Sequence, residues 1–507
     1  MELELATDAE AVATLSRLKP LLACRDGRPR SQALKIVWHD SPERGLLAEG
    51  MILAEHRGVQ RLERVYPGAA TWLPGQPVPV VAEAPDLAAL PSPLAPLAAF
   101  EGRQTASVHQ SGGRAVTVTV AKGILRSVTA ERPAARIWLS GEEQAVGDIA
   151  RLIAGAVPAG VPLTSLAADG VALATGRPAA ARHGGAPELP TGPLSVADAL
   201  MHILGHLIDV VLVNAPLAVR RDGDATEAVH QMRVAVRRAR SAVSIFQGAF
   251  PGGALGPVND ALKHLSARLG PTRDWDVFAE ETIPAIQQSL PEDDRLRRLI
   301  AAAERRRRES QAALAGYLES AAFRLLGVEL AWLVSARFCH VASEVAADDA
   351  AGGSPIGAVP DAATGSVGSV PDRAASLAEF AGRVLQQRWK KLVSSGKQID
   401  DLDIPSLHGV RLRAKRARYA AEMFATLYQG KASHRFIRRL SALQERLGVL
   451  NDGVAASHLL TQLGGPAGRH GYAVGLVTGF LAARAVRMRP RIVDAFERSR
   501  RQPAYWA

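Results

Sequence analysis

Two stretches of the chain carry a histidine followed by three basic residues at identical spacing. The basic residues come three, seven and ten positions after the histidine. The first stretch has His230, Arg233, Arg237 and Arg240, and the second has His408, Arg411, Lys415 and Arg418. Neither stretch offers a nucleophile with its base or a set of carboxylates, so we predict no catalytic residue, no metal site and no cofactor. Cationic hydrogen-bond donors instead suit an anion whose charges repeat.

The spacing between the two stretches is kept well beyond the basic residues. Each residue of the first pattern has its counterpart 178 positions later. The same offset relates Leu269-Gly270 to Leu447-Gly448 and Asp274 to Asp452. A register kept over about forty-five positions indicates an internal duplication. The duplication predicts two similar structural units related by an approximate two-fold axis.

On a helix, which turns 100° per residue, the basic residues of each stretch share one side. In the first stretch an adjoining face is apolar and consists of Val229, Met232, Val236, Val243 and Phe246. We call the two basic faces the first ridge and the second ridge. Like charges at this spacing cost a helix about 0.2–0.5 kcal/mol per pair, and no acidic residue interrupts either ridge. A bound anion is the natural compensation, whereas the alternative is a solvated basic face.

Other cations are expected to contribute to the same site. They are Lys263, Arg305, Arg308, Arg388, Lys390, Lys391, Arg435 and Arg439. The run Arg305–Arg308 lies within one predicted helix, so only one or two of its four arginines can face a shared site. Glu422, four residues after Arg418, is expected to orient that arginine.

The charge of the chain is unevenly distributed. Its 507 residues carry a formal net charge of +11. Residues 1–190 have 19 basic and 19 acidic residues, so the whole excess lies in residues 191–507, together with the two ridges. This distribution indicates a polyanionic partner for the C-terminal part. A basic surface that only aids solubility is the alternative.

Composition also bears on location. No run of about twenty uninterrupted apolar residues is present, so we predict no membrane span. The acidic start Met-Glu-Leu-Glu is unlike a signal peptide, and the two cysteines, Cys24 and Cys339, fit a reducing cytoplasm. The sequence does not define an oligomeric state.

The hydrophobic pattern changes near residue 175. Before it, Val116–Val120 and Arg136–Leu139 predict strands, and Ala145–Ala156 predicts a helix. After residue 194, helices are predicted over 197–213, 226–247, 255–269, 295–336, 377–394, 406–428, 434–447 and 473–486. The expected fold is an α+β domain rich in antiparallel strands over 1–175, a linker over 176–193, and an all-α domain of two pseudo-symmetric helical bundles over 194–507. The bundles occupy 194–344 and 373–507, on either side of a flexible linker over 345–372 that is rich in Gly and Pro.

The residue types of the ridges restrict the kind of anion. Proteins that read bases pair cations with Asn and Gln, and single-strand binders add stacking aromatics. Tyr419 is the nearest aromatic candidate. A ligand with phosphates and no bases needs only positive charge and hydrogen-bond donors, which favours inorganic polyphosphate over nucleic acid. Histidine gains charge as the pH falls through about 6–7, so binding should strengthen in mild acid.

At these residues the chain resembles the CHAD family, the conserved-histidine α-helical domain. The resemblance rests on the strings that begin at Val229 and Leu407 and on Trp389-Lys390-Lys391-Leu392 ahead of the second string. It covers about residues 194–507. It implies two helical bundles in pseudo-two-fold relation, with a basic groove or pore that binds polyphosphate, and association with bacterial polyphosphate granules. The family's conserved histidines correspond to His230 and His408, and its basic residues correspond to those of the two ridges.

CHAD domains often follow a CYTH domain, the triphosphate tunnel fold, and residues 1–175 resemble it in a degenerate form. Glu2-x-Glu4 is similar to the start of the family's metal and phosphate motif, but Ala6 stands where a lysine is expected. Arg136 lies in the segment where an acidic strand is expected, and Lys122 stands where an aspartate is usual. The resemblance implies a tunnel- or barrel-like domain that has lost the carboxylates for Mg²⁺ or Mn²⁺. We therefore expect no triphosphatase activity. A metal-dependent triphosphatase or polyphosphatase is the alternative, and a nucleic-acid binder is a second one.

Overall fold

The computed structural model describes residues 1–65, 80–176, 182–190, 192, 194–220, 224–250, 255–288, 293–332, 376–428 and 430–506. The chain divides into two compact units. The first contains Met1–His183, Leu204–Leu217 and Tyr317–Gly352, and the second contains Gly184–Ile203, Ala218–Gly316 and Gly353–Ala507. The predicted linker over 345–372 lies outside the described residues, as does part of the one over 176–193.

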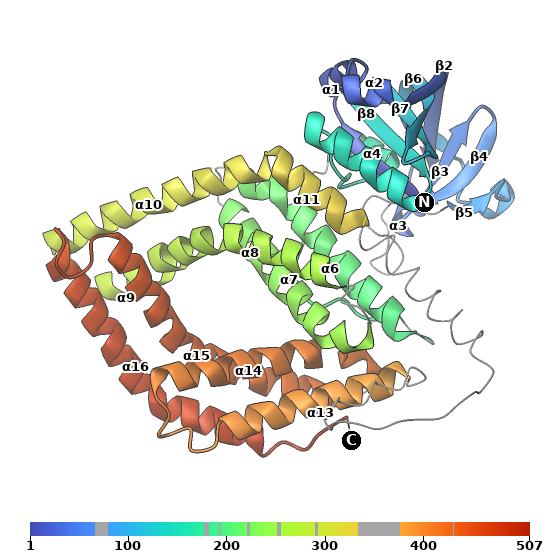
Figure 1. The fold of residues 1–507 in the computed structure, drawn as a ribbon. Coiled ribbons are helices and arrows are strands. Elements are labelled where there is room, and N and C mark those ends of the chain that lie inside the picture. The colour runs from blue at the N-terminus through green and yellow to red at the C-terminus, as the bar shows by residue number, and fades with distance from the viewer. Residues whose placement is uncertain are drawn as a thin grey trace, which may run out of the picture. The chain divides into compact units, whose positions relative to one another are not determined.

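The first unit is built on an eight-stranded antiparallel sheet (Figure 1). Its strands are β1 (Glu2–Thr7), β2 (Arg25–Asp40), β3 (Met51–His56), β4 (Val59–Arg64), β5 (Val80–Glu83), β6 (Ala95–Ser111), β7 (Arg114–Ser127) and β8 (Glu131–Gly141). Their order in the sheet is β1-β8-β7-β6-β2-β3-β4-β5. The predicted α+β fold rich in antiparallel strands is therefore confirmed. The expected tunnel- or barrel-like closure is not seen, because within the described residues β1 and β5 are the two edges of an open sheet.

Short helices accompany the sheet. They are α1 (Ala9–Leu15), α2 (Lys19–Ala23), α3 (Gly45–Ala48), α4 (Glu143–Ala156) and α5 (Leu166–Thr175). Leu34, Ile36 and Trp38 of β2 pack into the same core as α5, because alternate residues of a strand face one side. Ser165 caps α5 by accepting the N–H of Ala168. Gly176 ends this helix at φ 65°, a left-handed conformation that glycine adopts without strain.

The C-terminal part consists of long helices, as predicted. They are α6 (Val196–Val219), α7 (Asp224–Phe246), α8 (Gly256–Val277), α9 (Ile283–Gln287), α10 (Asp294–Leu318), α11 (Ala321–Trp332), α13 (Leu377–Ser395), α14 (Ile404–Met423), α15 (Lys431–Gln462) and α16 (Gly471–Arg500). A π-helical turn, η4 (Phe278–Thr282), joins α8 to α9. These elements confirm a helical region after the sheet domain.

Several predicted helices differ in length from the observed ones, among them the helix expected over 255–269, which continues to Val277 in α8. The helix expected over 295–336 is divided between α10 and α11, where the Ser320 hydroxyl donates to the Tyr317 carbonyl; positions 333–336 lie outside the described residues. The helices expected over 434–447 and 473–486 are extended in α15 and α16. Gly448 follows the predicted end at 447, but α15 continues through this glycine because α15 packs along α16, and packing outweighs a glycine cost of about 1 kcal/mol.

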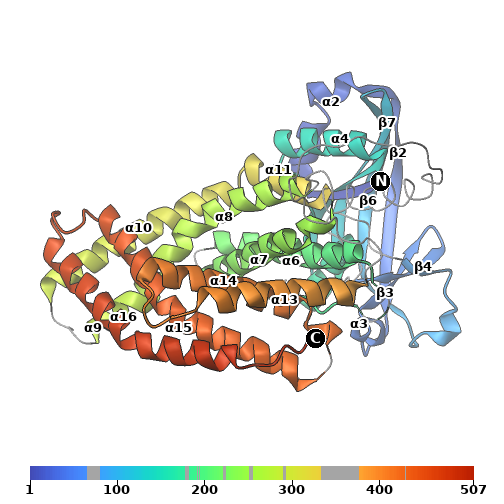
Figure 2. The ribbon, with the colours of Figure 1, turned by 60° about the horizontal axis from the view of Figure 1, so that its bottom comes forward.

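The two halves of the duplication meet inside the second unit. The first ridge lies on α7 and the second on α14, and Phe246 contacts Phe424 with ring centroids 5.9 Å apart. These phenylalanines are 178 residues apart, so the contact joins equivalent positions, as a two-fold axis requires. A second core joins α8, α9 and α10 to α15 and α16 through residues such as Trp275, Leu299 and Val474. Helix α15 lies beside α16, and α13 lies beside α14, as Figures 1 and 2 show.

Part of the helical sequence belongs to the first compact unit. Helix α11 packs along α4, where the Arg151 guanidinium lies 4.8 Å from the centre of the Trp332 ring and also pairs with Glu329. A Cβ on Gly147 would lie 2.8 Å from the Trp332 indole nitrogen, so this close approach requires glycine.

Helix α6 is the one described helix that is long and apolar enough, by length and composition, to cross a membrane. Within it, 72% of the most apolar window is buried inside the structure. Such burial is typical of a core helix in a globular protein.

Candidate anion-binding site

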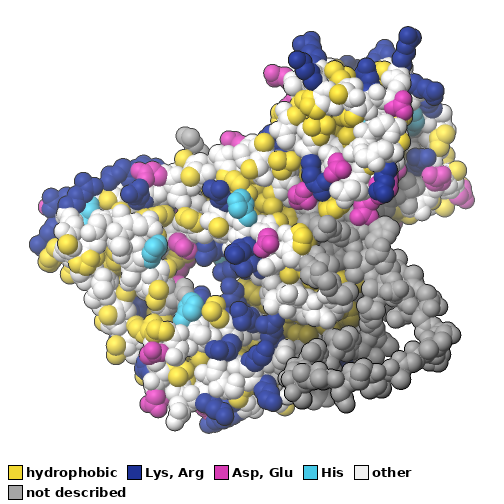
Figure 3. Space-filling model, in the orientation of Figure 1, with side chains coloured by type: hydrophobic (Ala, Val, Ile, Leu, Met, Phe, Trp, Pro, Cys, Tyr) yellow, Lys and Arg dark blue, Asp and Glu magenta, His cyan; other side chains and the backbone are white. Residues whose placement is uncertain are grey.

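The two ridges converge on one cavity in the second unit. The cavity has a volume of about 220 Å³ and is lined by residues of both halves of the duplication. Its charged lining residues are His230, Arg233, Arg237, Arg273, Asp274, Glu281, Arg411 and Asp452. Figure 3 shows a hollow among the helices with dark blue Lys and Arg side chains on its wall. The duplication thus places cations from α7 and α14 around a single space.

Two equivalent Arg–Asp pairs face this cavity, one from each copy. Arg233 lies 3.1 Å from Asp274 and also donates to the Gly270 carbonyl at 3.0 Å. Arg411 and Asp452 occupy the positions 178 residues later, and they attract each other electrostatically. Burial raises the pKa of both aspartates even though the arginines oppose the shift. As the pH falls, protonation of these carboxyls removes the negative charges that face the two arginines.

Lys415 and Arg237 stand at equivalent positions; Arg237 lines the cavity, whereas Lys415 is not among the lining residues and interacts electrostatically with Arg237 and Arg411. Burial lowers the pKa of Lys415 to about 7. The positive charges that add to this shift belong to Arg237, Arg411, Arg233 and Arg418. In the described part of the chain neither Lys415 nor Arg237 forms an ion pair, and the Nε atoms of Arg237, Arg240 and Arg411 have no hydrogen-bond partner. Cations withdrawn from water in this way are costly unless an anion neutralises them.

One aromatic ring and one carboxylate hold the neighbouring ridge residues. Tyr419 is 2% exposed, and its ring centre lies 4.9 Å from the Arg238 guanidinium, 5.6 Å from Lys415 Nζ and 5.0 Å from the Arg418 guanidinium. Glu422 pairs with Arg418 at 2.7 Å, as expected, and also with Arg238 of the other copy. Glu422 therefore connects α14 to α7 as well as orienting Arg418.

The two histidines of the repeat lie in different surroundings. His230 lines the cavity, and burial together with the charge of Arg273 lowers its pKa. His408 is exposed and is not among the residues that line the cavity. A neutral imidazole held among arginines takes up a proton more readily when an anion arrives. His230, rather than His408, is placed to respond to a phosphate in this cavity.

The additional cations predicted from the sequence are spread more widely. Arg388 lies beside the C-terminal end of α7, where it donates to Ser244 at 3.2 Å; burial and the charge of Arg416 lower its pKa. Arg439 donates to the Arg498 carbonyl near the end of α16. Exposed positions are occupied by Lys263, Lys390, Lys391 and Arg435. None of these residues lines the cavity described above.

The four consecutive arginines of α10 face different directions. Arg305 and Arg308 are exposed, and neither lines the cavity. Arg305 instead lies near His470, whose pKa is lowered by burial and by nearby arginines. Arg307 is turned inward and pairs with the buried Asp276 at 2.7 Å. The structure therefore places the predicted ligands Arg305 and Arg308 on another surface of α10.

Sequence reasoning missed several cavity residues. Asp274 and Asp452 were recognised as markers of the duplication, and their shared offset was the available signal for a shared site. Arg273 gave no such signal, because its counterpart 178 positions later is Asn451. Glu281 reaches the cavity from η4, an irregular turn that helical periodicity does not predict.

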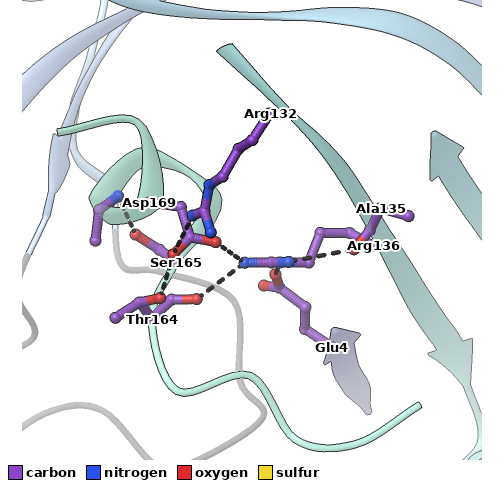
Figure 4. A network of polar contacts seen from close by, with 8 residues as sticks. Glu4, Arg132, Ala135, Arg136, Thr164, Ser165 and Asp169 are labelled. Carbon is purple, nitrogen blue, oxygen red and sulfur yellow. Dashed lines mark hydrogen bonds and ion pairs between the residues drawn. The ribbon is translucent and has the colours of Figure 1, made fainter. Parts of the chain in front are cut away.

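The N-terminal sheet holds a second ionic cluster, shown in Figure 4. Arg136 on β8 donates to Glu4 at 3.0 Å and to Asp169 at 2.6 Å, and both Glu4 and Arg136 are buried. Asp169 also pairs with Arg132 at 3.2 Å and accepts the hydroxyl of Thr164 at 2.6 Å. The basic residue in the expected acidic strand therefore neutralises Glu4. Within the described residues, no group of three or more His, Cys, Asp or Glu side chains could hold a metal ion.

Comparison with known proteins agrees with the helical architecture. A family model for the CHAD domain matches residues 202–461, so this chain belongs to the CHAD family. The crystal structure of the CHAD domain from the plant Ricinus communis is similar, with a TM-score of 0.50 and 29% sequence identity. That similarity covers 64% of this chain and 99% of the plant domain.

The curated relatives are bacterial. An uncharacterized protein of Mycobacterium tuberculosis, present in strains H37Rv and CDC 1551, is 30% identical over 239 residues. This match covers 46% of the chain and 40% of the mycobacterial protein, so the chain spans less than half the length of these relatives.

Proposed function

We propose that this protein binds inorganic polyphosphate in the cavity between the two ridges, without catalysis, and that it associates with polyphosphate granules in a bacterial cytoplasm. The observation that carries the proposal is the position of Lys415. Its amine lies among arginines of both copies, and within the described residues it has no carboxylate partner. An external anion supplies the negative charge that this cluster lacks.

The kind of anion follows from the groups around the cavity. Arg233, Arg237 and Arg411 offer planar guanidinium groups, which donate pairs of hydrogen bonds to phosphate oxygens. Tyr419, the aromatic residue nearest the ridges, is buried beneath cations and is not available to stack on a base. A chain of phosphates requires charge without base recognition. These features favour polyphosphate over single-stranded nucleic acid.

The ionic cluster of the sheet domain supports binding without hydrolysis. Glu4, the glutamate of the metal motif implied by resemblance, is buried and paired with Arg136. Burial raises the pKa of Glu4. A carboxylate already satisfied by a guanidinium is a poor ligand for Mg²⁺ or Mn²⁺, which need accessible oxygen atoms. A triphosphatase located in residues 1–175 is the alternative function.

Competition binding tests the choice of ligand. Labelled polyphosphate bound to the full chain is challenged at about 150 mM salt with unlabelled polyphosphate or single-stranded RNA at equal phosphate concentration, because salt weakens both interactions. Polyphosphate is expected to displace the label at least about tenfold better. Displacement by RNA with a tenfold advantage would assign the site to nucleic acid instead.

A hydrolysis assay tests the absence of catalysis. Purified protein is incubated with triphosphate or polyphosphate and either Mg²⁺ or Mn²⁺, and released phosphate is measured. We expect no release above buffer. Release that disappears in Glu4→Gln, while polyphosphate binding persists, would show that the sheet domain is an active hydrolase.

Fluorescence microscopy tests the location. A fusion of the full chain to a fluorescent protein is expected to coincide with stained polyphosphate granules. A fusion spread evenly through cells that contain granules would contradict this part of the proposal.

A further inference from the structure

The cavity between the ridges is lined by cations and by carboxylates, and different elements supply them. Helices α7 and α14 supply His230, Arg233, Arg237 and Arg411. Helix α8, the turn η4 and helix α15 supply the acidic residues, which are Asp274, Glu281 and Asp452. A ligand whose oxygen atoms only accept hydrogen bonds is attracted by the first group and repelled by the second. The acidic residues therefore indicate a ligand with a donor of its own.

The aspartates are paired with arginines of the same lining. Asp274 Oδ1 lies 3.1 Å from Arg233 Nη2. The equivalent residues of the second copy, Asp452 and Arg411, attract each other. One carboxylate has about four acceptor sites, so an arginine partner leaves capacity for a second donor. Each pair thus presents guanidinium donors next to carboxylate acceptors, which suits a phosphate that accepts hydrogen bonds and also carries an O–H.

The ridges extend beyond the cavity toward the C-terminal ends of α7 and α14. Arg240 and Arg418, their last residues, do not line it. Another part of the lining is apolar: Phe278, Ala456 and Leu459 also belong to the buried core that joins α8, α9 and α10 to α15 and α16. A polyanion can follow the ridges, but placing its charge against apolar groups is costly. This distribution of charge favours a chain that ends in the cavity over one that continues through it.

We propose that the cavity binds the terminal phosphate of a polyphosphate chain, while the ridges hold the phosphates that follow. This inference rests on the proposed function and specifies which part of the ligand occupies the cavity. At neutral pH a phosphate within the chain has only acceptor oxygens, whereas a terminal phosphate loses its last proton only near about pH 6 and can keep an O–H beside a carboxylate. That O–H donates to Asp452 or Asp274, and the other oxygens accept from Arg411 and Arg233.

The carboxylates then distinguish a chain end from the rest of the chain. A phosphate without an O–H meets Asp274, Glu281 and Asp452 as like charges with no hydrogen bond in return. Selectivity of this kind depends on repelling the wrong ligand as much as on attracting the right one. Internal segments and cyclic polyphosphates, which have no terminal phosphate, are therefore disfavoured in the cavity.

Calorimetric titration of the full chain with two polyphosphates tests the proposal. Linear tripolyphosphate has chain ends, whereas cyclic hexametaphosphate has no end and carries more negative charge. At about 150 mM salt for both, the linear compound is expected to bind at least about tenfold more tightly, which is the scale of one charge-assisted hydrogen bond. Equal or tighter binding of the cyclic compound would show that charge alone determines affinity and would overturn the proposal.

Asparagine variants test whether the carboxylates make this distinction. Asp452→Asn and Asp274→Asn each keep the shape of the side chain and remove its charge. In each variant cyclic hexametaphosphate should bind more tightly, and the preference for tripolyphosphate should fall below about threefold. A ring that is merely too large for the cavity would be rejected equally by the variants and the unmodified chain, so an unchanged preference in both variants refutes the proposal. Thermal unfolding checks that each variant is folded.

Glu422→Gln is the matched control. Glu422 pairs with Arg418 and Arg238 but does not line the cavity. Removing its charge should tighten the binding of both polyphosphates and leave the preference within about twofold of that of the unmodified chain. A preference that falls as far in Glu422→Gln as in the asparagine variants would assign the effect to overall charge. If neither polyphosphate binds the unmodified chain, the proposed function fails; if both bind and the cyclic one binds as tightly, only the chain-end inference fails.

Discussion

Arg136 in the N-terminal sheet is surrounded by carboxylates, whereas Lys415 in the helical region is surrounded by arginines. Both side chains are largely withdrawn from water, where an uncompensated charge is costly. Arg136 is neutralised within the protein by Glu4 and Asp169. Lys415 has no such partner among the described residues. The comparison separates a structural ionic cluster, whose charges are balanced within the protein, from a cluster for which we propose an external anion.

The two ridges also differ in whether an arginine is neutralised by a carboxylate of the protein. Arg418 pairs with Glu422, while its counterpart Arg240 has an Nε atom without a hydrogen-bond partner in the described part of the chain. The residue at the position equivalent to Glu422 is Ser244. The two copies therefore share the cations of the ridges and differ at the position of Glu422, so the charge around the ridges is asymmetric although their frame is duplicated.

Arg136→Met should produce the largest effect, because it leaves Glu4 buried without its cation. We expect the sheet domain to lose about 3 kcal/mol of unfolding free energy at pH 7, measured by hydrogen exchange of β1 and β8. The pKa of Glu4 is already raised by burial and would rise further. A carboxyl with a raised folded-state pKa regains stability as the pH falls, so the loss should shrink toward about pH 5.

Arg126→Met is the matched control for that variant. Arg126 is 49% exposed and pairs with Glu101 and Glu131 at the surface of the same sheet. Its loss should cost less than about 1 kcal/mol, because water screens exposed ion pairs. Equal losses of unfolding free energy in the two variants would mean that the buried cluster around Arg136 stabilises the sheet no more than an exposed ion pair does.

Charge reversal at Arg237, which lines the cavity, or at Lys415 should give the largest effect on binding. Arg237→Glu and Lys415→Glu are each expected to weaken polyphosphate binding by about 10- to 100-fold, measured by fluorescence anisotropy. Because the proposed function has both residues act on one ligand, the double variant should lose less than the product of the two single effects. Arg297→Glu makes the same change in net charge on an exposed part of α10 and should cost less than about threefold. Small, independent effects at Arg237 and Lys415 would support two solvated basic faces instead.

The pH dependence of binding should depend on Lys415. Its pKa is lowered to about 7, so in the free protein it loses its charge as the pH rises through that value, whereas a bound phosphate holds the proton in place. We expect affinity to fall by about five- to tenfold between about pH 6 and 8.5. Arginine does not titrate in this range, so Lys415→Arg should have a flatter profile.

Other titrating groups of the cavity act in the same direction. His230 has a lowered pKa and becomes charged only in acid, while the raised pKa values of Asp274 and Asp452 bring the loss of their negative charges closer to neutral pH. Both changes make the cavity more positive as the pH falls. Calorimetry in buffers of different ionisation enthalpy measures the protons taken up on binding. Identical profiles for the unmodified chain and Lys415→Arg would exclude Lys415 as the titrating group.

The architecture and the centre of the site were accessible to sequence reasoning because both depend on repetition. The 178-residue offset that joins Arg233 to Arg411 also joins Asp274 to Asp452, and all four line one cavity. A repeat identifies residues that occupy equivalent places in a pseudo-symmetric frame. It does not identify residues that only one copy provides, such as Arg273 and Glu281.

Other features depend on where a side chain turns once the helices have packed. Arg305 and Arg307 are two residues apart on α10, yet one is exposed and the other pairs with buried Asp276. Composition cannot distinguish them, because the direction of each follows from the packing of α10 on its neighbours. Likewise, the sequence showed that Arg136 departs from the expected acidic strand, but only the fold reveals that it neutralises Glu4.

Glu422→Gln should make binding tighter by about two- to threefold. The change removes the one carboxylate that pairs with both Arg418 and Arg238, so these arginines become more attractive to phosphate. The same change should cost about 1 kcal/mol or more of stability, because Glu422 connects α14 to α7. Anisotropy and thermal unfolding measure the two effects. Weaker binding in this variant would mean that Glu422 mainly positions Arg418 for the ligand.

Arg305→Ala should have the smallest effect on polyphosphate binding, less than about twofold at 150 mM salt, because charges beyond a Debye length of about 8 Å are largely screened. Arg305 is exposed on α10 near His470 and does not line the cavity. Arg237→Ala removes the same charge from inside the cavity and should cost at least about tenfold. Anisotropy at two salt concentrations compares them directly. A loss in Arg305→Ala that equals the loss in Arg237→Ala would show that the net charge of the helical region, rather than the cavity between the ridges, determines binding.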